Sequence, residues 1–107
     1  MGDLNRVELE GVVVREPRVG QGKRTKYAFF TLENHRAEER RGLKIDVAAF
    51  GKLADVVEGS VAEGTRLKVI GSLRWRPRDG AGPGKLDVVA DRIELIGPTK
   101  NDQELPF

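Results

Sequence analysis

Three arginines at alternate positions, Arg74, Arg76 and Arg78, flank the chain's single tryptophan, Trp75, and precede a glycine-rich turn. Side chains at alternate positions of a β-strand lie on one face of it. A row of guanidinium groups can pair with the phosphates of a polyanion, and the flat guanidinium faces can stack on bases. We therefore expect this segment to line a groove for a phosphodiester chain.

The distribution of charge along the chain supports this interpretation. Residues 15–44 hold nine lysines and arginines against four acidic residues, and residues 66–85 hold six against one. The rest of the chain holds four against twelve, so a net charge of only +2 conceals two basic segments. Clustered cations favour polyanion binding because each neutralised phosphate releases counterions. The alternative for either segment is ordinary solvated surface charge.

The residue inventory argues against catalysis. The chain has no cysteine and one histidine, which excludes a disulfide framework, a thiolate nucleophile and a zinc site of the Cys/His type. The stretch GQGK at residues 20–23 lacks the spacing and the following helix of a phosphate-binding P-loop. We expect neither an enzyme nor a bound metal or other cofactor. The start of the chain resembles no signal peptide and no apolar run suggests a membrane helix, so we expect a cytoplasmic, nucleoid-associated protein with no membrane partner.

Hydrophobic periodicity predicts the elements that carry these residues. A period of two predicts five strands, and an apolar stripe at helical spacing predicts one short helix between the third and fourth strands. This order is that of the OB-fold, an all-β, five-stranded Greek-key barrel known for binding oligonucleotides and oligosaccharides. The expected strands are residues 5–15, 27–33, 43–50, 66–78 and 86–96, the helix is residues 53–61, and residues 16–26 are expected to form a loop.

Strand alternation also predicts which side chains face outward. Phe50 lies on the outward row of its strand with Lys44 and Asp46, although a core position beside the helix is the alternative. Trp75 falls on the core side with Leu73, unless the strand carries a bulge there. Trp75 therefore either caps the end of the barrel or stacks on bases.

Several stretches carry a family resemblance. The segments NRVELEGVVVREPRV, FTLEN, VAAFGKLADVV, EGTRLKVIGSLRWR and VVADRIELI resemble the strands and the helix of bacterial single-stranded DNA-binding proteins over residues 5–96. In that family, bases stack on aromatic side chains of the outer barrel face while basic hairpins follow the phosphates, and Phe50 matches a stacking position. Where many members have tryptophans, this chain offers His35, Lys44 and Arg78, so the resemblance implies a platform partly replaced by cations.

Together the charge pattern, the strand parity and the resemblance predict two sets of functional residues. The resemblance divides the chain into an OB-fold domain, residues 1–97, and a short, flexible tail, residues 98–107, similar to the acidic, Pro-Phe-ending tail through which that family recruits replication and repair proteins. The alternative is a frayed terminus that binds nothing. The predicted nucleic-acid-binding residues are Lys23, Arg24, Lys26, His35, Arg36, Arg40, Arg41, Lys44, Phe50, Arg74, Trp75, Arg76 and Arg78, and the predicted partner-binding tail residues are Asp102, Glu104, Leu105, Pro106 and Phe107.

The function implied is sequence-independent binding and protection of single-stranded DNA in replication, recombination or repair. The resemblance also implies a homo-oligomer, with a tetramer favoured and a dimer next, and the apolar Val12, Val14 and Ile70 on otherwise polar rows could mark a subunit contact. Two alternatives remain open. One is an RNA-binding OB module, and the other is a primosome-like adaptor whose main role is protein recruitment.

Overall fold

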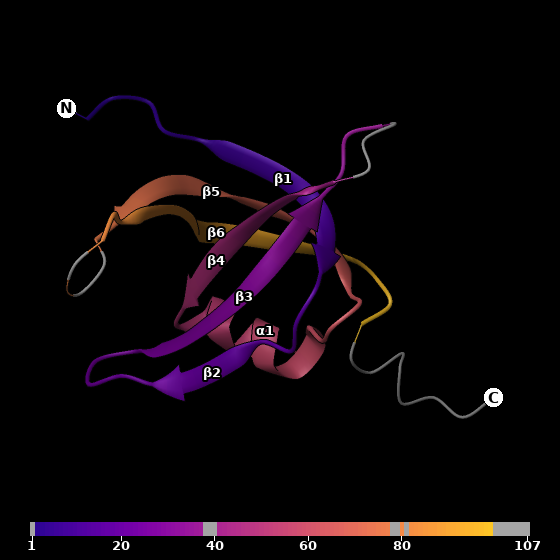
Figure 1. Ribbon diagram of the computed structural model, residues 1–107. Helices are drawn as coiled ribbons and strands as arrows, with labels where there is room; N and C mark the ends of the chain where they lie inside the picture. Colours follow the sequence, from indigo (N-terminus) through magenta and orange to yellow (C-terminus); the bar gives the residue numbers. More distant parts are fainter. Residues whose placement is uncertain (1, 38–40, 78–79, 81, 100–107) are drawn as a thin grey trace.

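The computed structural model describes residues 2–37, 41–77, 80 and 82–99. All five expected strands and the expected helix are present, and a sixth short strand lies within the segment that we expected to be a loop (Figure 1). In chain order the elements are β1 (Val7–Val13), β2 (Arg18–Gln21), β3 (Lys26–Asn34), β4 (Leu43–Phe50), α1 (Lys52–Ser60), β5 (Arg66–Arg76) and β6 (Lys85–Gly97).

The short strand β2 corrects the prediction of a continuous loop over residues 16–26. The chain reverses after β2 in a tight turn, where the N–H of Gly22 donates to the carbonyl of Thr25 at 2.9 Å. This turn pairs β2 antiparallel with the first residues of β3. Gly20 lies opposite Tyr27, and a Cβ added at Gly20 would meet the Tyr27 hydroxyl at 2.4 Å. Any larger residue at position 20 would therefore have to displace the Tyr27 ring.

The strands form a closed barrel. Their hydrogen-bonded order is β1-β5-β6-β4-β3-β2, and an additional pairing of β1 with β3 closes the ring. All neighbours are antiparallel except β4 and β6, which run parallel where Val47 lies opposite Val88. With α1 inserted between β4 and β5, this is the expected OB-fold arrangement. No helix in the described part of the chain is long and apolar enough to span a membrane.

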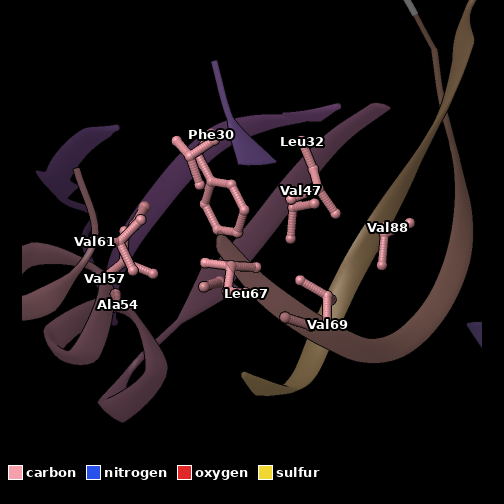
Figure 2. Close-up of a cluster of buried hydrophobic side chains, with 13 residues drawn as sticks. Phe30, Leu32, Val47, Ala54, Val57, Val61, Leu67, Val69 and Val88 are labelled. Atoms are coloured by element: carbon pink, nitrogen blue, oxygen red, sulfur yellow. The ribbon is translucent and has the colours of Figure 1, made fainter. Parts of the chain in front are cut away.

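The core fills the barrel with one row of side chains from each strand. Phe30 and Leu32 enter from β3, Leu67 and Val69 from β5, and Val88 from β6 (Figure 2). The helix α1 packs against β3, β4 and β6, and it contributes Ala54 and Val57 to the same cluster. Because alternate residues of each strand enter this core, the intervening residues form an outer row. The predicted strand parity is thereby confirmed for the barrel.

The hairpin of β5 and β6 runs beyond the barrel core. A register shift opposite Ile70 and Gly71 leaves one extra residue on β6, and farther along Trp75 pairs with Leu86. Trp75 keeps the parity of the inner row but is 59% exposed, because the hairpin has already passed the core at that point. Trp75 therefore lies outside the core cluster, and the register shift does not turn it toward the arginines.

Candidate nucleic-acid interface

Three aromatic side chains form one surface on the outer row of β3 and β4. Tyr27 and Phe29 alternate with the buried Ala28 and Phe30 along β3, while Phe50 lies opposite Tyr27 at the end of β4. The ring centroids of Tyr27 and Phe29 are 5.3 Å apart, and Phe50 meets Phe29 edge-on at 6.5 Å. Phe50 is 37% exposed and lies outside the core cluster. Its predicted outward placement is confirmed.

One of the predicted arginines, Arg76, lies beside this aromatic surface, and Arg74 lies on the same row of β5 two residues before it. Arg74 pairs across the hairpin with Asp87, and its Nε and Nη2 atoms donate to the two carboxylate oxygens at 3.1 and 2.8 Å. An Nη1 atom of Arg76 lies 3.8 Å from the same carboxylate. The guanidinium carbon of Arg76 is 5.5 Å from the centroid of the Phe29 ring, which is within cation–π range. The outward row of β5 therefore meets the outward row of β3.

A groove follows the outer face between these elements. It is a hollow of about 810 Å³, which we call the outer groove, and its lining residues include Arg15, Arg18, Tyr27, Phe29, Asp46 and Arg76. A second hollow of about 550 Å³ shares Arg15, Arg18, Thr31 and Asp46 with it and reaches Lys44 and Lys85. The two hollows thus adjoin along one surface. Such an elongated track suits a linear ligand better than a compact one.

Free positive charge in the outer groove comes from residues that the sequence analysis did not select. Among the residues that the structure describes, Arg15 and Arg18 form no salt bridge, and both line the two hollows. They lie on the connection from β1 to β2 and at the start of β2. Unpaired guanidinium groups beside aromatic rings provide the two kinds of contact that a single nucleic-acid strand needs, one for phosphates and one for bases.

The outer groove also contains a carboxylate with its own partners. Asp46 accepts a hydrogen bond from the Thr31 hydroxyl at 2.9 Å and forms a close ion pair with Lys85. Burial tends to raise the pKa of Asp46, but the bonds from Lys85 and Thr31 outweigh it and lower the pKa below the ordinary value of 3.8. Asp46 therefore stays ionised, and its charge is compensated within the protein.

This arrangement predicts a pH-dependent contribution of Asp46 to stability. Because the folded pKa lies below 3.8, the contribution is complete well above pH 3.8 and is lost as pH falls through the lowered folded pKa. An Asp46→Asn variant should therefore be less stable than the wild type at neutral pH, with the difference shrinking below about pH 4. Urea unfolding at a series of pH values measures this, and a difference that is constant over the acidic range contradicts it.

One predicted cation is engaged elsewhere. Lys26 has the inner-row parity of β3 and reaches α1, where it forms salt bridges with Asp55 at 2.8 Å and Glu58 at 2.5 Å. These bonds raise the pKa of Lys26. Lys26 therefore ties β3 to the helix and does not line the outer groove.

The remaining predicted residues fall into three groups. Lys23 and Arg24 are exposed in the turn between β2 and β3. His35, Arg36 and Arg41 lie in the connection from β3 to β4, and Lys44 lies at the start of β4, where Glu33 pairs closely with His35 and lies 3.9 Å from Lys44. Arg40, Arg78 and the tail residues Asp102, Glu104, Leu105, Pro106 and Phe107 lie outside the described residues.

Sequence reasoning missed Tyr27 and Phe29, although the signal was present. In the stretch YAFFTLE, Ala28 and Phe30 alternate with Tyr27 and Phe29. Because alternate residues of a strand face opposite sides, Tyr27 and Phe29 are assigned to the face opposite Phe30. Arg15, Arg18 and Lys85 belong to the two basic segments, but their approach to the groove depends on strand pairing, which local sequence does not show.

The chain resembles known proteins over most of its length. The family model described as the single-strand binding protein family matches residues 4–96. The replication restart protein PriB of Photobacterium profundum is 33% identical over 100 residues, which span 86% of this chain and 94% of that relative. Two solved structures share the fold: the Plasmodium falciparum SSB in complex with ssDNA, at 19% identity and a TM-score of 0.78, and the SSB domain of a Synechococcus sp. protein, at 16% and 0.73. The alignments cover 91% and 88% of this chain and 98% of each of those chains.

Proposed function

Because the chain belongs to the single-strand binding protein family, we propose that it binds single-stranded DNA without sequence preference in the outer groove. The observation that carries the proposal is the aromatic surface of Tyr27, Phe29 and Phe50 beside the unpaired Arg15 and Arg18. Every base has a flat face, so stacking tolerates any sequence, and guanidinium groups follow the phosphates. This function protects exposed strands rather than transforming them.

A titration of labelled oligo-dT by fluorescence anisotropy over a salt series tests the proposal. We expect binding that weakens steeply with salt and that clearly exceeds the affinity for a duplex of equal length. Equal affinity for single-stranded and duplex DNA would overturn it. Competition with a matched RNA oligomer examines the RNA-binding alternative, which a clear preference for DNA eliminates.

The emission of Trp75 reports separately on the β5–β6 hairpin. Trp75 is exposed on the inner-row side of that hairpin, opposite Arg74 and Arg76, and we propose that it stacks on a base as the strand leaves the outer groove. Quenching of Trp75 during the titration supports this. Binding without quenching leaves the proposed function intact and removes Trp75 from the contact surface.

Replacing both groove arginines should reduce the salt dependence of binding. In single-stranded nucleic acids each neutralised phosphate contributes about 0.7 to the slope of log K against log salt concentration. We expect the Arg15→Gln/Arg18→Gln variant to bind more weakly at low salt and to lower that slope by about 1.4. Arg92→Gln is the matched control, because Arg92 pairs with Glu94 at 3.2 Å and lies outside both hollows. An equal drop in slope for the control would contradict the assignment.

We further propose that the binding serves DNA replication, repair or recombination, with replication restart favoured by the 33% identity to PriB. In the adaptor alternative, the tail recruits proteins and strand binding is secondary. Removing Leu105, Pro106 and Phe107 should abolish capture of a replication or repair protein while leaving oligo-dT affinity unchanged. Retention of every partner after this deletion argues against the tail assignment.

We also propose self-association, with a tetramer favoured and a dimer next. Val12, Val14 and Ile70 are half-buried in the single chain, and Ile70 lies opposite Glu8, which pairs with Lys68 at 3.0 Å. A surface that carries both signs can meet its own copy without net repulsion. Light scattering coupled to size exclusion decides the state, and a monomer at all accessible concentrations contradicts the proposal.

A further inference from the structure

Asp87 is a buried carboxylate beside a surface that we assign to a polyanion. It is only 1% exposed, and both of its oxygens accept hydrogen bonds from Arg74. Arg76 shares the same carboxylate at 3.8 Å. One acidic side chain, contributed by β6, therefore holds two of the arginines that β5 places on the outer face.

Stability alone does not require an acidic residue at this position, and attraction to DNA disfavours one. A buried ion pair is often no more stable than apolar residues of similar volume. A carboxylate near the groove also repels phosphates, so electrostatic attraction alone favours its absence. What the pair does supply is geometry, because two-point bonding to a carboxylate fixes the plane of a guanidinium group.

Arg76 meets the aromatic surface, and Arg74 lies on the same row of β5 two residues before it. Arg76 lines the outer groove, and its guanidinium carbon is 5.5 Å from the centroid of Phe29. The side chains of Arg74 and Arg76 remain 37% and 41% exposed, so N–H groups that Asp87 does not engage can reach a ligand. An arginine ordered in this way before binding loses less conformational entropy when DNA arrives.

Building on the proposed function, we propose that Asp87 is a positioning residue for DNA binding, which fixes the guanidinium plane of Arg74 and attracts Arg76 to its place beside Phe29 before the strand arrives. Positioning and charge predict opposite signs for the variant Asp87→Asn. Positioning predicts about a tenfold rise in Kd, because two long side chains must then be ordered on binding. Charge alone predicts a fall in Kd, because one negative charge has been removed.

Asp46→Asn is the matched comparison, since it makes the same chemical change at a carboxylate that lines the groove and, like Asp87, lies near Arg76. Asp46 forms its ion pair with Lys85 and hydrogen-bonds Thr31, so it fixes no guanidinium plane. The ammonium group of lysine is a mobile point charge, and Lys85 released from Asp46 can still reach phosphates. We therefore expect Asp46→Asn to lower Kd for oligo-dT while Asp87→Asn raises it.

Two further variants separate positioning from a merely structural role. Arg74→Lys keeps the charge and leaves Asp87 paired, so the fold is protected, yet it removes the two-point hold; we expect a several-fold rise in Kd. In an Arg76→Gln background, Asp87→Asn should raise the Kd for oligo-dT by a smaller factor than in the wild type, because one of the positioned side chains is already gone. If Asp87 had only a structural role, Asp87→Asn would raise the Kd by the same factor in both backgrounds.

The test is oligo-dT anisotropy on these variants at one salt concentration, with thermal unfolding to identify any that do not fold. A rise in Kd for folded Asp87→Asn that shrinks in the Arg76→Gln background supports the inference. If Asp87→Asn does not fold, a rise in the Kd of Arg74→Lys for oligo-dT supports the inference, and an unchanged Kd of that variant overturns it. If the wild type binds oligo-dT and folded Asp87→Asn has an equal or lower Kd, the inference is overturned and the proposed function stands. Wild-type chain that fails to bind overturns the proposed function and this inference with it.

Discussion

The double variant Phe29→Leu/Phe50→Leu should lose at least about 30-fold in affinity for oligo-dT, because each base–aromatic stack contributes about 1–3 kcal/mol. Both rings lie on the outer rows of β3 and β4, in edge-to-face contact at 6.5 Å. Leucine retains apolar bulk at each position but removes the flat face on which a base can stack. Anisotropy at fixed salt measures the loss.

The salt dependence of this variant identifies the kind of contact that was lost. Stacking releases no counterions, so the slope of log K against log salt concentration should stay at the wild-type value, in contrast to the Arg15→Gln/Arg18→Gln variant. Tyr27→Phe is a matched control, because it keeps a ring in the same aromatic surface and removes only the hydroxyl. An affinity of the double variant equal to that of the wild type would show that bases do not enter the outer groove at Phe29 and Phe50.

The barrel could be predicted because its signals are local. Alternation of apolar and polar residues depends only on strand geometry, and it located all five expected strands and assigned Phe50 to the outer row. The switch to helical spacing after Gly51 located α1 in the same way. The barrel architecture followed from the OB-fold element order and the resemblance, whereas the individual strand pairings, such as that of β1 with β3, come from the structure alone.

The position of the hairpin could not be predicted from alternation. Parity correctly gave Trp75 the inner row, but a side chain on that row is buried only where the barrel core extends beneath it. β5 and β6 pass the core before Trp75, so Trp75 is exposed while Val69, on the same row, is fully buried. How far a strand extends beyond the core is a property of the whole barrel.

Charge counting also had a physical limit. Local composition located two basic segments, but it does not show which of their cations are neutralised by acidic side chains. Lys26 pairs with Asp55, Lys85 with Asp46 and Arg74 with Asp87, and each pair forms only when distant strands or the helix come together. The cations left free in the groove, Arg15 and Arg18, become visible only after these pairs are assigned.

The fold that positions the groove should be sensitive to one buried residue in particular. Leu67 is fully buried in the core. It lies on β5, which is hydrogen-bonded to β1 on one side and to β6 on the other. We expect Leu67→Ala to lower the free energy of unfolding by about 2–5 kcal/mol, because it removes buried methyl groups and leaves a cavity. Domains of this size have a total stability of about 5–15 kcal/mol, so the loss is a large share of it.

Leu95→Ala provides a control with the same chemical change on the adjacent strand. Leu95 lies directly opposite Leu67 in the β5–β6 ladder but is 38% exposed, so its loss should cost about 1 kcal/mol or less. Urea unfolding monitored by Trp75 fluorescence compares the two variants. Equal destabilisation would mean that the barrel relaxes around Leu67. A large difference would show that β5 is held by its inner row, which leaves the outer row of Arg74 and Arg76 free to be shaped by Asp87 and by DNA.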